Sequence, residues 1–120
     1  MLFRSQPDHR KRELYAEAFS LLRPGGWFVN LEHVASLTPR LESIWDQMFV
    51  DSMFASSRRE GQGKTREQIA AEYHGRADKA ANLLSPVERQ CGWLREIGYD
   101  DVDCYLKVFE LAVFGGRRPE

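Results

Sequence analysis

Two adjacent residues, Glu32 and His33, carry the side chains best placed for acid–base chemistry in this sequence. They directly follow an apolar run, Trp27–Leu31, whose short length, aromatic and β-branched content and preceding glycine pair predict a buried strand. Ligands of open α/β sheets bind beyond the carboxyl ends of strands, and histidine often serves as a general base. Glu32 and His33 are therefore the candidate catalytic residues. The alternative is that both are ordinary polar loop residues.

A second group of residues could form a surface for an apolar molecule. Aromatic and methionine side chains recur at helical spacing after residue 38, and Trp45, Phe49 and Tyr73 are the candidate substrate-binding residues among them. A stripe of this kind also forms the core between two helices, so that interpretation stays open.

Four helices are predicted around these residues. The first, Asp8–Leu22, has an apolar stripe at helical spacing and stops at Pro24-Gly25-Gly26. The other three begin at capping signals, which are Thr38 with Pro39, Thr65 with Gln68, and Ser85 and Pro86 with Glu88. Gly98 is a suitable residue to end the last of them.

Two strands are predicted at the end of the chain. Apolar and polar residues alternate over 102–107, and a second apolar run covers 108–114 before the pair Gly115-Gly116. The order of elements is one helix, one strand, three helices and two strands. Such an order is typical of an α/β domain.

The composition excludes several kinds of protein and partner. A chain of 120 residues suffices for one domain with a modest core, and 42% hydrophobic residues argue against disorder. The formal net charge of -1 gives no general attraction to nucleic acid or to an anionic membrane. No apolar stretch is long enough to span a bilayer, and no signal peptide is recognised at the amino terminus.

The two cysteines point to a reducing environment. Cys91 and Cys104 fit neither the spacing of metal ligands nor a disulfide framework. We therefore expect free thiols, a cytoplasmic location and no metal site.

Two segments resemble a known family. The run ELYAEAFSLLRPGGWFVNLEHV (Glu13–Val34) is similar to the segment of class I S-adenosylmethionine-dependent methyltransferases that holds a helix, a Pro-Gly-Gly turn and the fifth strand. The run WLREIGYDDVDCYLKVFELAVFGG (Trp93–Gly116) is similar to the last helix and terminal strand pair of that family. The resemblance implies a single partial Rossmann-like methyltransferase domain over 1–120. A helical insertion over 38–83 takes the place of the family's substrate cover.

The same resemblance implies a specific sheet. Its three strands, near 27–31, 102–107 and 108–114, belong to a mixed sheet accompanied by about four helices. The final strand should lie between the other two and run antiparallel to both. A helical conformation over 108–114 would contradict the assignment.

Features of the family's amino-terminal half are missing from these residues. There is no glycine-rich loop after a first strand and no acidic residue for the cofactor ribose. The only Gly-x-Gly, Gly61-Gln62-Gly63, falls between two predicted helices, which is the wrong context for a cofactor loop. The resemblance thus implies the carboxyl-terminal half of a small-molecule methyltransferase. S-adenosylmethionine would be the cofactor of the family, but this chain alone should not bind it and should be inactive.

Two other functions remain open, a non-enzymatic self-associating module and one half of a split methyltransferase completed by a partner chain. The expected partner is a second copy, because Trp27–Leu31 would form a hydrophobic edge strand. Pairing of this strand across a two-fold axis would give a continuous six-stranded sheet, and exchange of helices between subunits is the alternative. Neither nucleic acid nor a membrane is expected as a partner.

Overall fold

A computed structural model describes residues 5–75 and 83–120, and the chain divides into two compact units. Unit 1 comprises Met1–Ser36 and Asn82–Glu120, and unit 2 comprises Leu37–Ala81. The bounds of unit 2 lie close to those of the helical insertion expected over 38–83. Each unit is described below by itself.

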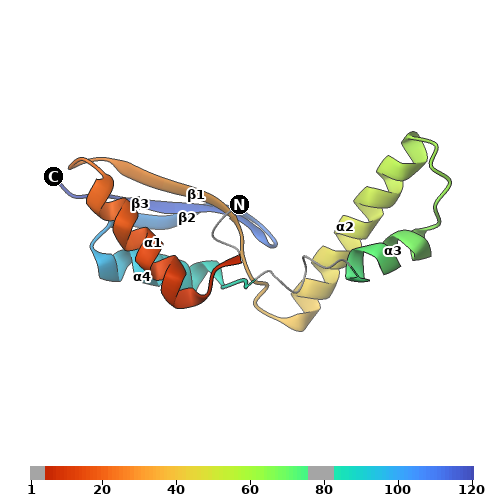
Figure 1. Cartoon of the computed structure of the whole chain (residues 1–120), viewed down its shortest axis with the longest axis horizontal. Coiled ribbons are helices and arrows are strands. Elements are labelled where there is room, and N and C mark those ends of the chain that lie inside the picture. Colours follow the sequence, from red (N-terminus) through yellow and green to blue (C-terminus); the bar gives the residue numbers. More distant parts are fainter. Residues whose placement is uncertain (1–4, 76–82) are drawn as a thin grey trace. The chain divides into compact units, whose positions relative to one another are not determined.

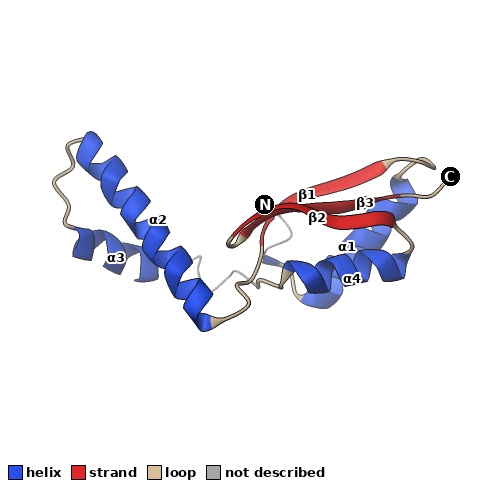
Figure 2. Ribbon diagram, turned by 180° about the vertical axis from the view of Figure 1, so that it is seen from behind, coloured by secondary structure: helices blue, strands red, loops and turns tan. Residues whose placement is uncertain are grey.

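Unit 1 is a three-stranded sheet with two helices on one of its faces (Figure 1). Its elements are α1 (Asp8–Leu21), β1 (Trp27–His33), α4 (Val87–Ile97), β2 (Asp100–Val108) and β3 (Leu111–Arg117). Figure 2 shows from behind that α1 and α4 both lie on the same side of the sheet. The predicted α/β class is therefore confirmed, with four helices and three strands among the described residues.

The strand order is β1-β3-β2, so the final strand lies in the middle as predicted. Both pairs are antiparallel, which makes this sheet antiparallel throughout rather than mixed. The apolar run predicted as one strand over 108–114 is interrupted by a turn at Phe109 and Glu110, where Phe109 has a φ of 50°. β1 and β3 approach so closely that a Cβ at Gly115 would lie 1.9 Å from the backbone oxygen of Phe28.

The core of unit 1 forms between the sheet and its two helices. Side chains alternate between the faces of a strand, so every second residue of β1 and β3 points toward the helices. Tyr15 of α1, Leu94 of α4 and Phe114 of β3 are fully buried there, with Cys91 beside them. Burial raises the pKa of the Cys91 thiol to about 11, so this cysteine is a core residue and not a reactive thiolate.

The other face of this sheet carries apolar side chains, and neither α1 nor α4 covers it (Figure 2). We call it the open face, and it consists of Trp27, Val29, Leu31, Leu106, Val108, Leu111 and Val113, which share one side by strand alternation and register. Leu31 is 61% exposed and Leu106 is 63% exposed. An antiparallel sheet with one free face normally shows polar residues there. The open face departs from that rule.

Unit 2 is a pair of helices, α2 (Pro39–Arg59) and α3 (Arg66–Gly75). Val50, Ile69 and Tyr73 form its small buried core. The predicted start of α2 is confirmed, because the Thr38 side chain accepts a hydrogen bond from the Leu41 amide and Pro39 occupies the first turn.

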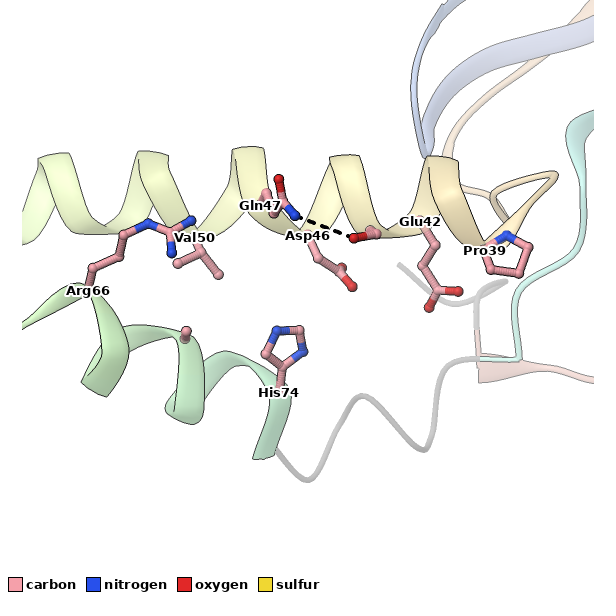
Figure 3. Close-up of a pocket in the computed structure, with 9 residues that line it drawn as sticks. Pro39, Glu42, Asp46, Gln47, Val50, Arg66 and His74 are labelled. Atoms are coloured by element: carbon pink, nitrogen blue, oxygen red, sulfur yellow. Dashed lines mark hydrogen bonds between the residues drawn. The ribbon is translucent and has the colours of Figure 1, made fainter.

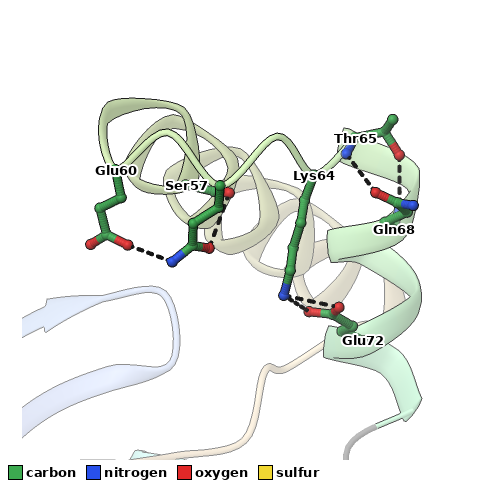
Figure 4. A network of polar contacts seen from close by, with 7 residues as sticks. Ser57, Glu60, Lys64, Thr65, Gln68 and Glu72 are labelled. Carbon is green, nitrogen blue, oxygen red and sulfur yellow. Dashed lines mark hydrogen bonds and ion pairs between the residues drawn. The ribbon is translucent and has the colours of Figure 1, made fainter.

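The predicted capping box at the start of α3 is also confirmed. The Gln68 amide donates to Thr65 Oγ1 at 3.1 Å, and the Thr65 amide donates to Gln68 Oε1 at 2.9 Å (Figure 4). Nearby, Lys64, which precedes α3, forms an exposed ion pair at 3.2 Å with Glu72 of this helix. Both helices of unit 2 therefore begin at the capping residues that the sequence predicts.

The capping box predicted at Ser85 is wrong. Pro86 is the N-cap residue of α4 and makes no side-chain cap, so Glu88 has no box partner at Ser85. The Ser85 hydroxyl donates instead to a carboxylate oxygen of Asp8 at the start of α1. Tertiary contact between two helix starts has replaced the local cap. The predicted helix end is right, because Gly98 ends α4 with a φ of 123°.

Candidate functional site

The candidate catalytic residues lie at the carboxyl end of β1, where Glu32 pairs with Ala112 and His33 with Leu111 of β3. Strand alternation sends the two side chains to opposite faces. Glu32 points into the helix-covered core and is 1% exposed. The side chains of His33 and Glu32 therefore lie on different faces of the sheet, although the two residues are neighbours in sequence.

His33 forms a side-chain hydrogen bond with a residue that the sequence alone did not single out. Its Nε2 lies 2.7 Å from Oε1 of Glu110, and both side chains are largely buried. Glu110 occupies the turn between β2 and β3, which antiparallel pairing brings to the carboxyl end of β1. Its other carboxylate oxygen accepts a hydrogen bond from the Ser36 hydroxyl.

The backbone adds a second link between this turn and the end of β1. The Val34 amide donates to the carbonyl oxygen of Glu110 at 2.7 Å. Main-chain and side-chain bonds thus hold His33, Ser36 and Glu110 together. Because hydrogen bonds to charged groups are stronger than neutral ones, the Glu110 carboxylate fixes the His33 ring firmly.

Glu32 is a buried carboxyl with incomplete hydrogen bonding. Its Oε1 accepts from the His33 amide at 3.3 Å, while Oε2 has no hydrogen-bond partner among the described residues. Burial raises the pKa of Glu32, and the His33 amide and the Asn30 side chain oppose that rise. A carboxyl in this state holds a proton more tightly than one in water, which suits an acid or base.

A row of buried polar residues continues from Glu32 through the core of unit 1. Asn30 donates to the Tyr15 hydroxyl at 3.4 Å, and that hydroxyl donates to the Gln90 side chain. Lys11 is also buried, and its ammonium donates to the carbonyl of Leu83. Burial raises the pKa of Tyr15 and lowers the pKa of Lys11. Such rows are costly unless satisfied, so they hold one arrangement of the core.

In unit 2, the candidate substrate-binding residues form one aromatic row. The ring centroids of Trp45 and Phe49 are 5.9 Å apart, and those of Phe49 and Tyr73 are 5.2 Å apart. Tyr73 belongs to the buried core of this unit, and its hydroxyl donates to Asp46 at 2.7 Å. Phe49 is 38% exposed and is the most accessible of the three.

A pocket of about 270 Å³ opens between α2 and α3 (Figure 3). Its lining is largely polar and charged and comprises Pro39, Glu42, Ser43, Asp46, Gln47, Val50, Arg66, Ala70 and His74. The aromatic row is not part of this lining.

The Gly61-Gln62-Gly63 segment does not follow a strand. Gly61 and Gly63 both have a φ of 70° and lie in the turn between α2 and α3, not after a strand. Within the described residues, no group of three His, Cys, Asp or Glu side chains could hold a metal ion. No helix in 5–75 or 83–120 is long and apolar enough to cross a membrane.

Comparisons with known proteins support the fold. No family model matches the chain, and no curated protein matches it. Among solved structures, an O-methyltransferase family protein from Burkholderia thailandensis is similar over 99% of this chain, with a TM-score of 0.57 and 16% identical residues. The chain spans 28% of the length of that protein. The likeness shows that these residues have a methyltransferase-like fold.

Proposed function

We propose that this chain is the carboxyl-terminal part of a small-molecule S-adenosylmethionine-dependent methyltransferase that is inactive by itself. The observation that carries the proposal is the His33–Glu110 pair at the carboxyl end of β1, in a fold similar to that of an O-methyltransferase family protein. Ligands of open α/β sheets bind at this end of the strands. A partner chain with the missing amino-terminal half would complete the enzyme.

In such an enzyme the residues of this chain would act on the acceptor. S-adenosylmethionine, when bound by the other half, would supply an electrophilic methyl group. The His33 imidazole would take the proton from an acceptor hydroxyl, and the Glu110 carboxylate would stabilise the imidazolium that results. Separately, Trp45, Phe49 and Tyr73 of unit 2 are proposed as residues that bind an apolar molecule.

Calorimetric titration tests the first part of the proposal. The chain alone is expected to give no saturable heat with S-adenosylmethionine in the micromolar range. The reason is that its only Gly-x-Gly lies between two helices. A clear binding isotherm with this chain alone would contradict the proposal of an incomplete cofactor site.

Complementation tests the second part. The chain would be co-expressed with the product of a neighbouring gene that carries a glycine-rich cofactor loop, and transfer of labelled methyl groups to phenolic acceptors would be measured. His33→Asn is expected to lower the rate about 100-fold, as typical for loss of a general base. His9→Asn, in the exposed first turn of α1, is the matched control and should leave the rate unchanged.

A non-enzymatic, self-associating module is the second candidate function. The open face favours it, because a large exposed apolar patch often marks an interaction surface. Absence of methyl transfer with every tested partner, together with a stable oligomer of this chain, would favour this alternative.

A further inference from the structure

Ser36 is the third polar residue beside the His33–Glu110 pair, and the proposed function gives it no role. Its hydroxyl donates a hydrogen bond to Oε2 of Glu110, while Oε1 of the same carboxylate lies 2.7 Å from Nε2 of His33. The two oxygens of one carboxylate therefore serve different partners. The side chains of His33 and Glu110 are only 12% and 7% exposed, so water has little access to compete for these contacts.

The backbone around Ser36 is held on both sides. The Val34 amide donates to the carbonyl oxygen of Glu110 at 2.7 Å, and the Ala35 amide donates to the carbonyl oxygen of Ser85 at 3.0 Å. These bonds tie the segment after β1 to the turn between β2 and β3 and to the residues before α4. The Ser36 hydroxyl therefore approaches Glu110 from a fixed position. A carboxylate bonded in this way can rotate only by breaking that hydrogen bond.

The chemistry of His33 and Glu110 decides which ring nitrogen carries the proton. An ionised carboxylate only accepts hydrogen bonds, and the Ser36 donor favours the ionised form of Glu110. An ordinary imidazole is a stronger base than an ordinary carboxylate, so the proton between Oε1 and Nε2 belongs to the ring. A neutral imidazole carries one N–H. With Nε2 protonated, the lone pair of the ring therefore belongs to Nδ1.

We propose that Ser36 is a positioning residue, whose hydroxyl holds the Glu110 carboxylate in the orientation that keeps neutral His33 as the Nε2–H tautomer. Buried carboxylates in serine proteases hold an imidazole in its working tautomer in the same way. Proton uptake is thereby assigned to Nδ1, an assignment that rests on the proposed function. The O–H bond of the acceptor breaks, Nδ1 forms the new N–H bond, and the positive charge of the ring lies beside Glu110.

Removal of the Ser36 hydroxyl should loosen this arrangement without touching the ring itself. Oε2 of Glu110 would lose this donor in a largely buried place, and a buried acceptor that loses a donor costs free energy until another replaces it. The carboxylate would then turn toward water, and the His33 ring would lose its fixed acceptor. Its Nε2–H proton should exchange with water faster, and the two neutral tautomers should mix.

Nuclear magnetic resonance of the isotope-labelled chain tests the proposal, because long-range correlations between ring protons and ring nitrogens distinguish the tautomers. In mildly alkaline solution, where histidine rings are neutral, His33 should be wholly the Nε2–H tautomer with a slowly exchanging ring N–H. Its signals are assigned by their loss in His33→Asn. His9 and His74 are exposed and serve as internal references with mixed tautomers. A His33 ring protonated on Nδ1 in the unaltered chain would overturn the proposal.

Variants of Ser36 separate positioning from packing. Ser36→Ala should let the His33 ring N–H exchange about 10-fold faster, as expected for loss of one hydrogen bond to a charged group. Ser36→Thr keeps the hydroxyl and should restore the wild-type signals. Ser20→Ala is the matched control, because the Ser20 hydroxyl donates to the carbonyl of Glu17 on the exposed side of α1, and it should change nothing at His33.

Unchanged His33 signals in a folded Ser36→Ala chain would refute positioning by Ser36. If Ser36→Ala fails to fold, Ser36→Cys takes its place, because it keeps the space filled and supplies only a weak donor. Failure here and failure of the proposed function give different results, since the ring is observed in this chain alone and without a methyl donor. Absence of methyl transfer with a complementing partner counts against the proposed function, whereas the wrong tautomer counts against the role of Ser36.

Discussion

The two units differ in the size of their buried cores. In unit 1, residues from five elements meet in one core, and Tyr15, Leu94 and Phe114 are fully buried. In unit 2, two helices share a core of Val50, Ile69 and Tyr73, while α2 keeps Ile44 and Met48 exposed. Contacts distant in sequence maintain the first unit, whereas local caps and one helix pair maintain the second. The difference predicts that unit 2 opens more readily than unit 1.

The largest expected effect is in the core of unit 1. Phe114→Ala should lower the free energy of unfolding of unit 1 by about 3–5 kcal/mol, because it removes a fully buried ring from the central strand. Hydrogen exchange read by mass spectrometry would show the loss of protection in β1, β3 and α4. Protection in these elements that stays within about 1 kcal/mol of the wild type would contradict this account of the core.

A smaller effect is expected for the equivalent change in unit 2. Ile69→Ala should cost about 2–4 kcal/mol in the amides of α2 and α3, because Ile69 is 2% exposed in a core with few neighbours. The amides of unit 1 should keep their protection, since the two cores share no residue. An equal loss in α4 would show that the units open together, and the comparison would then fail.

The smallest expected effect concerns the charge of Glu32. Burial raises its pKa, so the stability contributed by the protonated carboxyl is complete below the ordinary pKa of glutamate and is lost as pH rises through the raised value. Glu32→Gln stays neutral and should therefore stabilise unit 1 at neutral pH, by less than either loss above. It should have little effect in acid. Urea unfolding at both pH values checks this, and a gain that is independent of pH would contradict it.

Local signals in the sequence predicted much of this fold. Thr38 and the pair Thr65–Gln68 act within one turn of chain, so their hydrogen bonds follow from adjacent residue types. The order of strands came from the resemblance of the two end segments to a family. Position after a strand selected Glu32 and His33, and the structure places both at the carboxyl end of β1. Their catalytic role stays a prediction.

Contacts between distant residues could not be predicted in this way. Glu110 lies 77 residues after His33, and the run 108–114 looked like one continuous strand, so its single acid was not recognised as a turn residue. The Ser85–Asp8 bond is equally distant and displaced a local cap that the sequence favoured. The open face was also missed, because a run that is apolar on both sides is read as a strand buried on both sides.

The placement of unit 2 within the chain has a consequence for how such a protein can change. The chain leaves unit 1 after Ser36 and returns to it at Asn82, so the whole of unit 2 is a single insertion between β1 and α4. The cost of closing a loop grows only slowly with its length. Residues can therefore be gained or lost in this insertion with little effect on the register of the sheet. The helices of unit 2 can therefore change during evolution while the His33–Glu110 pair stays the same.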